Sequence, residues 1–228
     1  MRRLTVFRTL GVSVFSLTVG LLSSPAHAAV IAYTGTGATA GTNPNNLNIG
    51  RQFSVTGTGI TLQSLGVWDS GGDGLVNSHT VTFFQINSGA GAANASVTAI
   101  TGGSVTVPSG TAASLNSGFR FTSLTTPIFL SPGNYSVVVY GLNVTGGDPF
   151  GNGGGFPSNG NVTDIRFDPF QFTSNTSPTY PTQGDTNNHS SASFTYDLGN
   201  TTPEPGSLAL LGIAGVGLAS RRRRTRAQ

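Results

Sequence analysis

The sequence predicts an all-β protein whose main part is an antiparallel two-sheet sandwich, jelly-roll-like in its connections. Apolar and polar residues alternate over most of the chain, the pattern of a strand with one buried face. Clusters of Gly, Asn, Ser and Pro separate these alternating segments, and the 33 glycines supply many turns. No segment between the two ends has the period of an amphipathic helix, so both layers are expected to be sheets.

The expected strands follow one another at short intervals within residues 29–200, which are predicted to form one domain. They are residues 30–34, 49–56, 61–68, 79–86, 97–107, 118–124, 127–130, 134–142, 163–172 and 191–198. The strand at 97–107 is expected to break at Gly102-Gly103, because glycine weakens a strand interior.

One turn and one strand are predicted with particular detail. Ser131-Pro132-Gly133-Asn134 is a turn in which Pro sets φ and Gly permits a positive φ. It should join residues 128–130 to 135–140. The run Val137, Val138 and Val139 predicts a central strand that is buried on both faces.

Three long connections have low complexity, at residues 41–48, 143–161 and 174–190. Their Gly, Asn, Ser and Pro content makes them loops, and loops of this length are commonly either functional or disordered. Both alternatives remain open from the sequence.

The N-terminus, residues 1–28, has the three parts of a secretory signal peptide. Positive residues begin the chain, residues 10–22 form an apolar run, and Ala26-His27-Ala28 fits the small-x-small rule of signal peptidase. Cleavage is therefore predicted between Ala28 and Ala29, against the alternative of an uncleaved anchor. The domain is thus expected to be exported. Because the chain has no cysteine, its stability must come from sheet packing rather than disulfides.

The charges exclude a nucleic-acid partner. The chain has a formal charge of +3, but most of its arginines lie at the two ends. Residues 29–200 contain three arginines and seven aspartates, a formal charge of −4. A nucleic-acid-binding face would need basic residues spread over the folded domain.

The C-terminal residues 201–228 combine a proline-flanked glutamate, a short apolar run and an arginine cluster. The run at 207–220 would span roughly 21 Å as a helix, whereas the hydrocarbon core of a bilayer is about 30 Å thick. Arg221, Arg222, Arg223 and Arg224 would hold its end on the cytoplasmic side. Pro203 and Pro205 favour an extended, accessible chain outside the membrane. These features predict a temporary transmembrane anchor with a cleavage site, with a permanent single-pass anchor as the alternative.

Pro203-Glu204-Pro205, the Gly-rich apolar run and the arginine cluster, in that order, resemble the PEP-CTERM sorting signal of Gram-negative bacteria. In that family an exosortase, a membrane-embedded cysteine protease-transpeptidase, recognises the tripeptide and removes the tail. Thr202 and Gly206 stand where valine and a small hydroxyl residue are commoner in the family. The resemblance implies transient anchoring in the inner membrane, a final place at the cell surface or outside the cell, and association with exopolysaccharide or biofilm matrix.

The stretch from Trp68 to His79 is the most suggestive chemically. It resembles a hairpin that recurs in sandwich domains of PEP-CTERM proteins, a resemblance that implies no activity. Asp69, Asp73 and Asn77 place oxygen atoms around glycines, so they are the candidate ligands of a calcium ion. The alternative, which we favour, is a metal-free hairpin turn in which the aspartates accept from backbone amides. Apart from this possible calcium, no cofactor is expected.

No catalytic motif occurs in the chain, and we expect no enzymatic activity. Asp164, Arg166 and Asp168 lie at alternate positions, which predicts a solvated polar face of one strand. His79 and His189 are the histidines of the exported domain, and nothing in the sequence assigns them a partner. The sequence therefore predicts a structural or adhesive surface protein. The alternative is a secreted domain that binds or hydrolyses carbohydrate.

Overall fold

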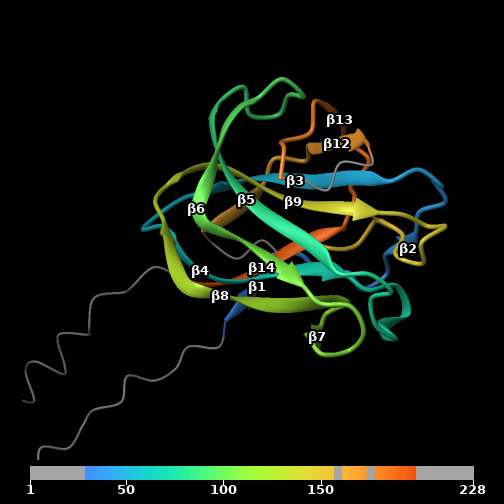
Figure 1. The fold of residues 1–228 in the computed structure, drawn as a ribbon. Helices are drawn as coiled ribbons and strands as arrows, with labels where there is room; N and C mark the ends of the chain where they lie inside the picture. The colour runs from blue at the N-terminus through green and yellow to red at the C-terminus, as the bar shows by residue number, and fades with distance from the viewer. Residues whose placement is uncertain (1–28, 157–160, 174–177, 199–228) are drawn as a thin grey trace, which may run out of the picture.

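The computed structural model describes residues 29–156, 161–173 and 178–198, which form two facing antiparallel sheets (Figure 1). The first is a five-stranded sheet. Its strands in spatial order are β1 (Val30–Ile31), β14 (Ala192–Leu198), β4 (Ile60–Trp68), β8 (Phe119–Leu130) and β7 (Ser114–Asn116).

The second is a seven-stranded sheet. Its strands in spatial order are β13 (Gln183–Asp185), β12 (Asp168–Phe172), β3 (Leu47–Val55), β9 (Gly133–Leu142), β5 (His79–Ser88) and β6 (Ser96–Val107), and β11 (Val162–Asp164) also pairs with β3. A separate ribbon joins β2 (Thr39–Ala40) to β10 (Gly151–Asn152). The predicted all-β architecture is confirmed for the described residues, whose only helical element is a 3-10 turn at Ser70–Gly72. The jelly-roll connectivity stays a prediction.

Aromatic rings join the two sheets across a shared core. Phe194 of the five-stranded sheet lies 4.7 Å from Phe53 and 5.0 Å from Phe83 of the seven-stranded sheet, centroid to centroid. All three side chains are fully buried. Because side chains alternate along a strand, the outer face of the seven-stranded sheet has a second cluster, in which Tyr180 packs on Phe84.

The central strand is confirmed. Val137, Val138 and Val139 of β9 have no exposed surface, and β9 lies between β3 and β5. Val137 and Val139 face the core between the sheets, and Val138 faces the outer cluster. This is the arrangement of a strand that is covered on both faces.

Three strand predictions were wrong in detail. Residues 96–107 form one strand, since Gly102, with φ of +75°, bends the chain at a bulge rather than ending it. Residues 119–130 are also continuous, and Pro127 lies where the pairing with β4 is interrupted, so its missing N–H costs no ladder bond. The predicted strand at 163–172 is instead divided into β11 and β12.

Two predicted turns connect the sheets rather than neighbouring strands. The turn at Ser131-Pro132-Gly133-Asn134 carries the chain from β8 in one sheet to β9 in the other, which confirms the predicted connection. The segment from Asp69 to Ser78 was predicted as a hairpin, and this was wrong. It joins β4 of the five-stranded sheet to β5 of the seven-stranded sheet, and these strands are not paired.

Both predicted end segments, 1–28 with its cleavage site and 201–228 with its membrane run, lie outside the described residues. Within the described residues, no helix has the length and hydropathy needed to cross a bilayer.

We expect residues 29–200 to fold by themselves without reductant, because their core is made by their own strands. Far-UV circular dichroism should show a β spectrum. In urea unfolding, Phe194→Ala should lower the free energy of unfolding by about 3–5 kcal/mol. The matched change Phe129→Ala, at a side chain that is 59% exposed, should cost less than about 1 kcal/mol. A disordered or helical spectrum, or equal costs for the two variants, would contradict this account of the core.

Candidate functional site

The site begins with an arginine on the core-facing side of a strand. Arg51 lies in β3 between Ile49 and Phe53, and the alternation of the strand turns all three side chains to the same face. Arg51 is only 3% exposed. The guanidinium carbon lies 5.8 Å from the centroid of the Tyr33 ring. A permanent positive charge therefore stands at the border of the hydrophobic core.

Two aspartates neutralise this charge. Arg51 donates from Nε to Asp164 Oδ1 at 2.9 Å, and its Nη2 donates to the second oxygen of the same carboxylate. Nη1 donates to Asp168 Oδ1 at 3.0 Å. The planar guanidinium thus holds one carboxylate with two atoms and the next with one. Its partners come from 113 and 117 residues further along the chain.

A break between β11 and β12 brings both carboxylates to Arg51. Asp164 of β11 pairs with Phe53, and Phe170 of β12 pairs with Ile49. The stretch between Asp164 and Phe170 therefore has two more residues than the stretch of β3 that lies opposite it. Arg166, in the break, has a φ of +58°. Gln52 bridges the break by donating its N–H to Phe167 O and accepting from Ile165 N, which keeps the two pieces aligned.

The predicted solvated face of Asp164, Arg166 and Asp168 was therefore wrong. Asp168 has no exposed side-chain surface and Asp164 has 11%, because both turn inward to Arg51. Only Arg166 is exposed. The period-two pattern failed because the chain is not a continuous strand here.

Burial and charge act in opposite directions on these groups. Burial disfavours the charge of Arg51, but the hydrogen bond to Asp164 and the charge of Asp168 outweigh it and raise the pKa of Arg51. Burial raises the pKa of Asp168, although Arg51 and the backbone N–H of His189 favour its charged form. Burial, reinforced by the charge of Asp164, raises the pKa of Tyr33 well above its ordinary value. Tyr33 therefore stays neutral beside a charged guanidinium.

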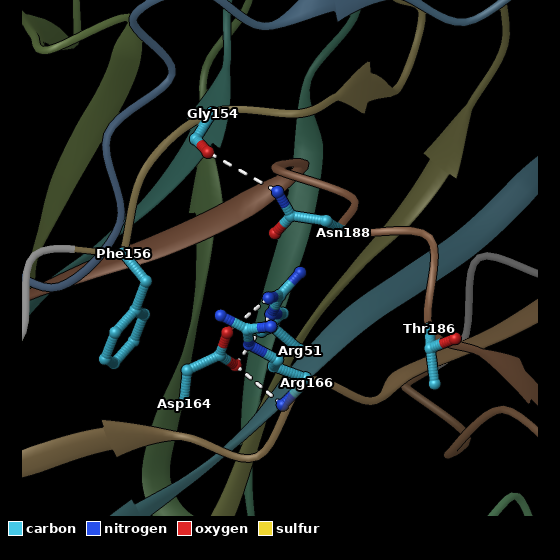
Figure 2. A pocket seen from close by; sticks show the side chains of 7 residues that line it. All are labelled: Arg51, Gly154, Phe156, Asp164, Arg166, Thr186 and Asn188. Atoms are coloured by element: carbon cyan, nitrogen blue, oxygen red, sulfur yellow. Dashed lines mark hydrogen bonds and ion pairs between the residues drawn. The ribbon is translucent and has the colours of Figure 1, made fainter.

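A pocket of about 310 Å³ adjoins this ion cluster, and Figure 2 shows the residues that line it. It is lined by Arg51, Gly154, Phe156, Asp164, Arg166, Thr186 and Asn188. Asn188 donates from its side chain to Gly154 O at 3.4 Å, which connects the two loops on either side. The ring of Phe156 packs on Tyr33 with centroids 4.6 Å apart. The pocket thus presents cationic, anionic, amide and hydroxyl groups beside one aromatic ring.

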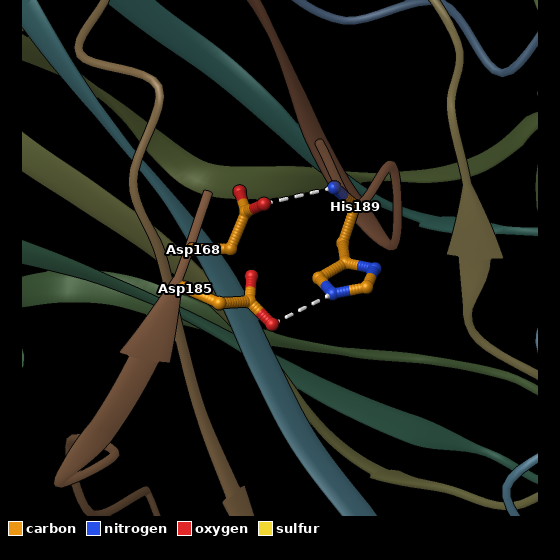
Figure 3. A group of neighbouring side chains, drawn as sticks. All are labelled: Asp168, Asp185 and His189. Atoms are coloured by element: carbon orange, nitrogen blue, oxygen red, sulfur yellow. Dashed lines mark hydrogen bonds and ion pairs between the residues drawn. The ribbon is translucent and has the colours of Figure 1, made fainter. Parts of the chain in front are cut away.

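A second group of side chains is connected to this pocket through Asp168, which accepts from the pocket-lining Arg51. Asp168, Asp185 and His189 each offer one ligand atom, and these atoms lie within 4.8 Å of one another (Figure 3). Within the described part of the chain, these acidic and histidine side chains are close enough together to hold a metal ion.

The residues predicted for calcium are held by separate partners. Asp69 is 3% exposed and accepts from Arg120 Nε at 2.7 Å and from Gly74 N at 3.1 Å. Arg120 also donates to the carbonyls of Ala113 and Gly72. Its guanidinium thus gives Asp69 a positive partner from within the chain. Asp69 thus accepts from a backbone amide as the favoured alternative predicted, although the segment is not a hairpin.

Asn77 belongs to a different network. Its backbone and side-chain N–H groups donate to Asp148 Oδ2, at 2.7 and 3.1 Å. The same oxygen lies 3.0 Å from His79 Nε2, and His79 Nδ1 lies 3.0 Å from Tyr140 O. Asp73 is exposed. Calcium binding by Asp69, Asp73 and Asn77 stays a prediction, although the structure ties Asp69 and Asn77 to different partners.

Few features of the amino-acid sequence point to this site. Arg51 looked like one polar residue in an alternating strand, and Asp185 and His189 lay in a connection predicted only as a loop. The spacing of Asp164 and Asp168 is visible in the sequence, but their common partner is more than a hundred residues away. The one indication in the sequence is that cationic side chains are scarce, with three arginines and seven aspartates between residues 29 and 200. An arginine in this domain is therefore expected to pair with more than one aspartate.

The comparisons with known proteins concern the C-terminus. The family model described as the PEP-CTERM protein-sorting motif matches residues 201–224. The motif predicted from Pro203-Glu204-Pro205 and the arginine cluster is therefore confirmed. No significant match was found among curated proteins or among solved structures.

We expect Arg51→Met to lower the free energy of unfolding by about 3–5 kcal/mol, because it leaves a buried carboxylate without its partner. Arg166→Met, the same change at an exposed arginine, should cost less than about 1 kcal/mol. Adding Asp168→Asn to Arg51→Met should recover part of the loss. Urea unfolding of the three variants measures this. If Arg51→Met were as mild as Arg166→Met, the ion cluster would not hold β11 and β12 in place.

Proposed function

We propose that this chain, a PEP-CTERM protein by its C-terminal motif, is processed by an exosortase and ends at the cell surface or outside the cell as a structural or adhesive component. The match at residues 201–224 is the observation on which this depends. Such a motif implies export and sorting from a membrane-anchored state. Signal peptidase would act first, between Ala28 and Ala29.

The properties of the tail support removal rather than permanent residence. An apolar run about 9 Å shorter than the bilayer core is only marginally stable as a spanning helix. The arginines at its end resist transfer across the membrane. The tail can therefore stop in the inner membrane long enough for the proline-flanked Glu204 to be recognised.

The pocket supports an adhesive role with saccharide as the bound group. Saccharide recognition commonly needs hydrogen-bonding groups of both kinds around one aromatic face. Arg166 and Asn188 offer donors, Asp164 offers an acceptor, and Phe156 offers the ring. A sugar unit of an exopolysaccharide fits this chemistry, and it would connect the exported domain to the extracellular matrix.

The same pocket is a poor site for glycoside hydrolysis. A hydrolase needs one carboxyl group that donates a proton and a second that is free to act as base or nucleophile. Both oxygens of Asp164 accept from Arg51, so this carboxylate is not free to act as base or nucleophile, and Asp168, also bonded to Arg51, does not line the pocket. We therefore propose binding without catalysis.

In the native host, the tail should be removed at or beside Pro203-Glu204-Pro205. Replacing Arg221 to Arg224 with serine should release full-length, unprocessed protein, because nothing then retains the short helix. Replacing Pro203, Glu204 and Pro205 with alanine should leave the protein uncut in the membrane. Intact-mass analysis of each recovered protein measures the outcome. A surface or secreted wild-type form that retains the mass of residues 207–228 would identify the tail as a permanent anchor.

On a glycan array, residues 29–200 should bind an acidic or neutral saccharide without hydrolysing it. Phe156→Ala and Arg166→Ala should each weaken binding about tenfold, because each removes one wall of the pocket. Phe172→Ala is the matched aromatic control, since Phe172 is exposed but does not line the pocket. Released reducing ends would establish the hydrolytic alternative. Binding that is unaffected by the pocket variants would place the saccharide elsewhere.

A further inference from the structure

The group formed by Asp168, Asp185 and His189 has the donors of a metal site. It joins three separate parts of the chain, namely the start of β12, the end of β13 and the segment before β14. The donor set is mixed, with two carboxylates and one imidazole, and is not simply an acidic patch. Asp168 has no exposed side-chain surface, and the side chain of His189 is 10% exposed. Two of the three donors are therefore shielded from water.

Each carboxylate is already held in position by other groups. Asp168 Oδ1 accepts from Arg51 and Oδ2 accepts from His189 N at 2.9 Å. Asp185 accepts from the backbone N–H and from the side chain of Asn187, one bond on each oxygen. Every one of these oxygens keeps a second lone pair. The partners fix the orientation of the carboxylates, as outer groups do around a metal ion.

The orientation of the His189 ring is the second, independent observation. Its Nδ1 lies 3.0 Å from the amide oxygen of Asn152, outside the group of three, so a proton on Nδ1 has an acceptor there. The ring also packs edge-on against Phe150, with centroids 5.3 Å apart. These contacts turn the other ring nitrogen, Nε2, toward the two carboxylates, 3.4 Å from Asp185 Oδ2.

One imidazole nitrogen and one oxygen of each carboxylate thus lie within 4.8 Å of one another at a largely buried place, and a cation between them would contact all three donors. Imidazole nitrogen with two carboxylates is a donor set that suits zinc among the common divalent ions, since calcium and magnesium prefer oxygen alone. Three protein ligands are also the number found at many zinc sites that keep one position for another ligand.

We propose that Asp168, Asp185 and His189 bind one Zn²⁺ ion. This goes beyond the proposed function and does not depend on it. The ion would connect the seven-stranded sheet to the loop at 185–189, which supplies Thr186 and Asn188 to the pocket. That loop is already tied to β10 by backbone bonds from Gly153 N to Asn188 O and from Ser190 N to Gly151 O. Zinc would hold its other side against β12 and so fix one wall of the pocket.

The test is calorimetric titration of ZnCl₂ into the full-length chain in detergent, after treatment with EDTA. We expect one ion per chain. Asp185→Asn and His189→Gln should each weaken binding about tenfold or more. Asp73→Asn is the matched control, because Asp73 is an exposed aspartate outside the group, and it should leave binding unchanged. Circular dichroism of each variant establishes that it is folded.

Nitrogen NMR of the His189 ring in the wild-type protein is an independent measurement that needs no variant. We expect the Nε2 signal to shift when zinc is added, and the zinc-bound ring to carry its proton on Nδ1. A ring protonated on both nitrogens in the presence of zinc would identify a simple ion pair with Asp185 and overturn the proposal. So would the absence of saturable zinc binding, binding that Asp185→Asn and His189→Gln leave unchanged, or a preference for calcium over zinc.

Discussion

The positive charge of Arg51 at the edge of the core is the constraint on which the rest of the site depends. A guanidinium at this position can stay only if carboxylates reach it, because an unpaired buried charge costs several kcal/mol. Asp164 and Asp168 both reach it because the strand between them breaks. The break leaves Arg166 outside the paired strands, where it lines the pocket with Arg51 and Asp164. One buried charge thus determines the break in the strand, part of the pocket lining and the position of Asp168.

A related arrangement occurs at both ends of the segment that passes from β4 in one sheet to β5 in the other. Arg120 of β8 holds Asp69 in the segment that leaves β4, and His79 at the start of β5 holds Asp148 from a distant loop. In both cases an aspartate also accepts from backbone N–H groups of the connecting segment. These pairs attach long irregular segments to the sheets in a domain that has no cysteine for cross-linking. Removing one partner of such a pair leaves the other buried without compensation.

The proposed tasks of residues 29–200 and of the C-terminal tail are physically separate. We propose that the tail acts through its sequence, its length against the bilayer and its charge, all of which are local properties. The domain would act through groups that only folding brings together, at the pocket and at the adjacent Asp168, Asp185 and His189. The pocket and the proposed zinc site share the loop at 185–189, so a change in one is expected to affect the other.

The sequence by itself determined the alternating strands, the buried strand at Val137 to Val139, the turn after β8 and the C-terminal sorting motif. Each depends on residues close together in the chain, where period, turn chemistry and motif order are visible. Only the tertiary structure decided that Asp69 pairs with Arg120, and that Asp164 and Asp168 turn inward to Arg51. It also decided that residues 69–78 cross between sheets. The physical reason is that a buried charge pairs with the opposite charge that folding brings closest to it. For Arg51, strand pairing between residues more than a hundred positions apart determines which aspartates these are.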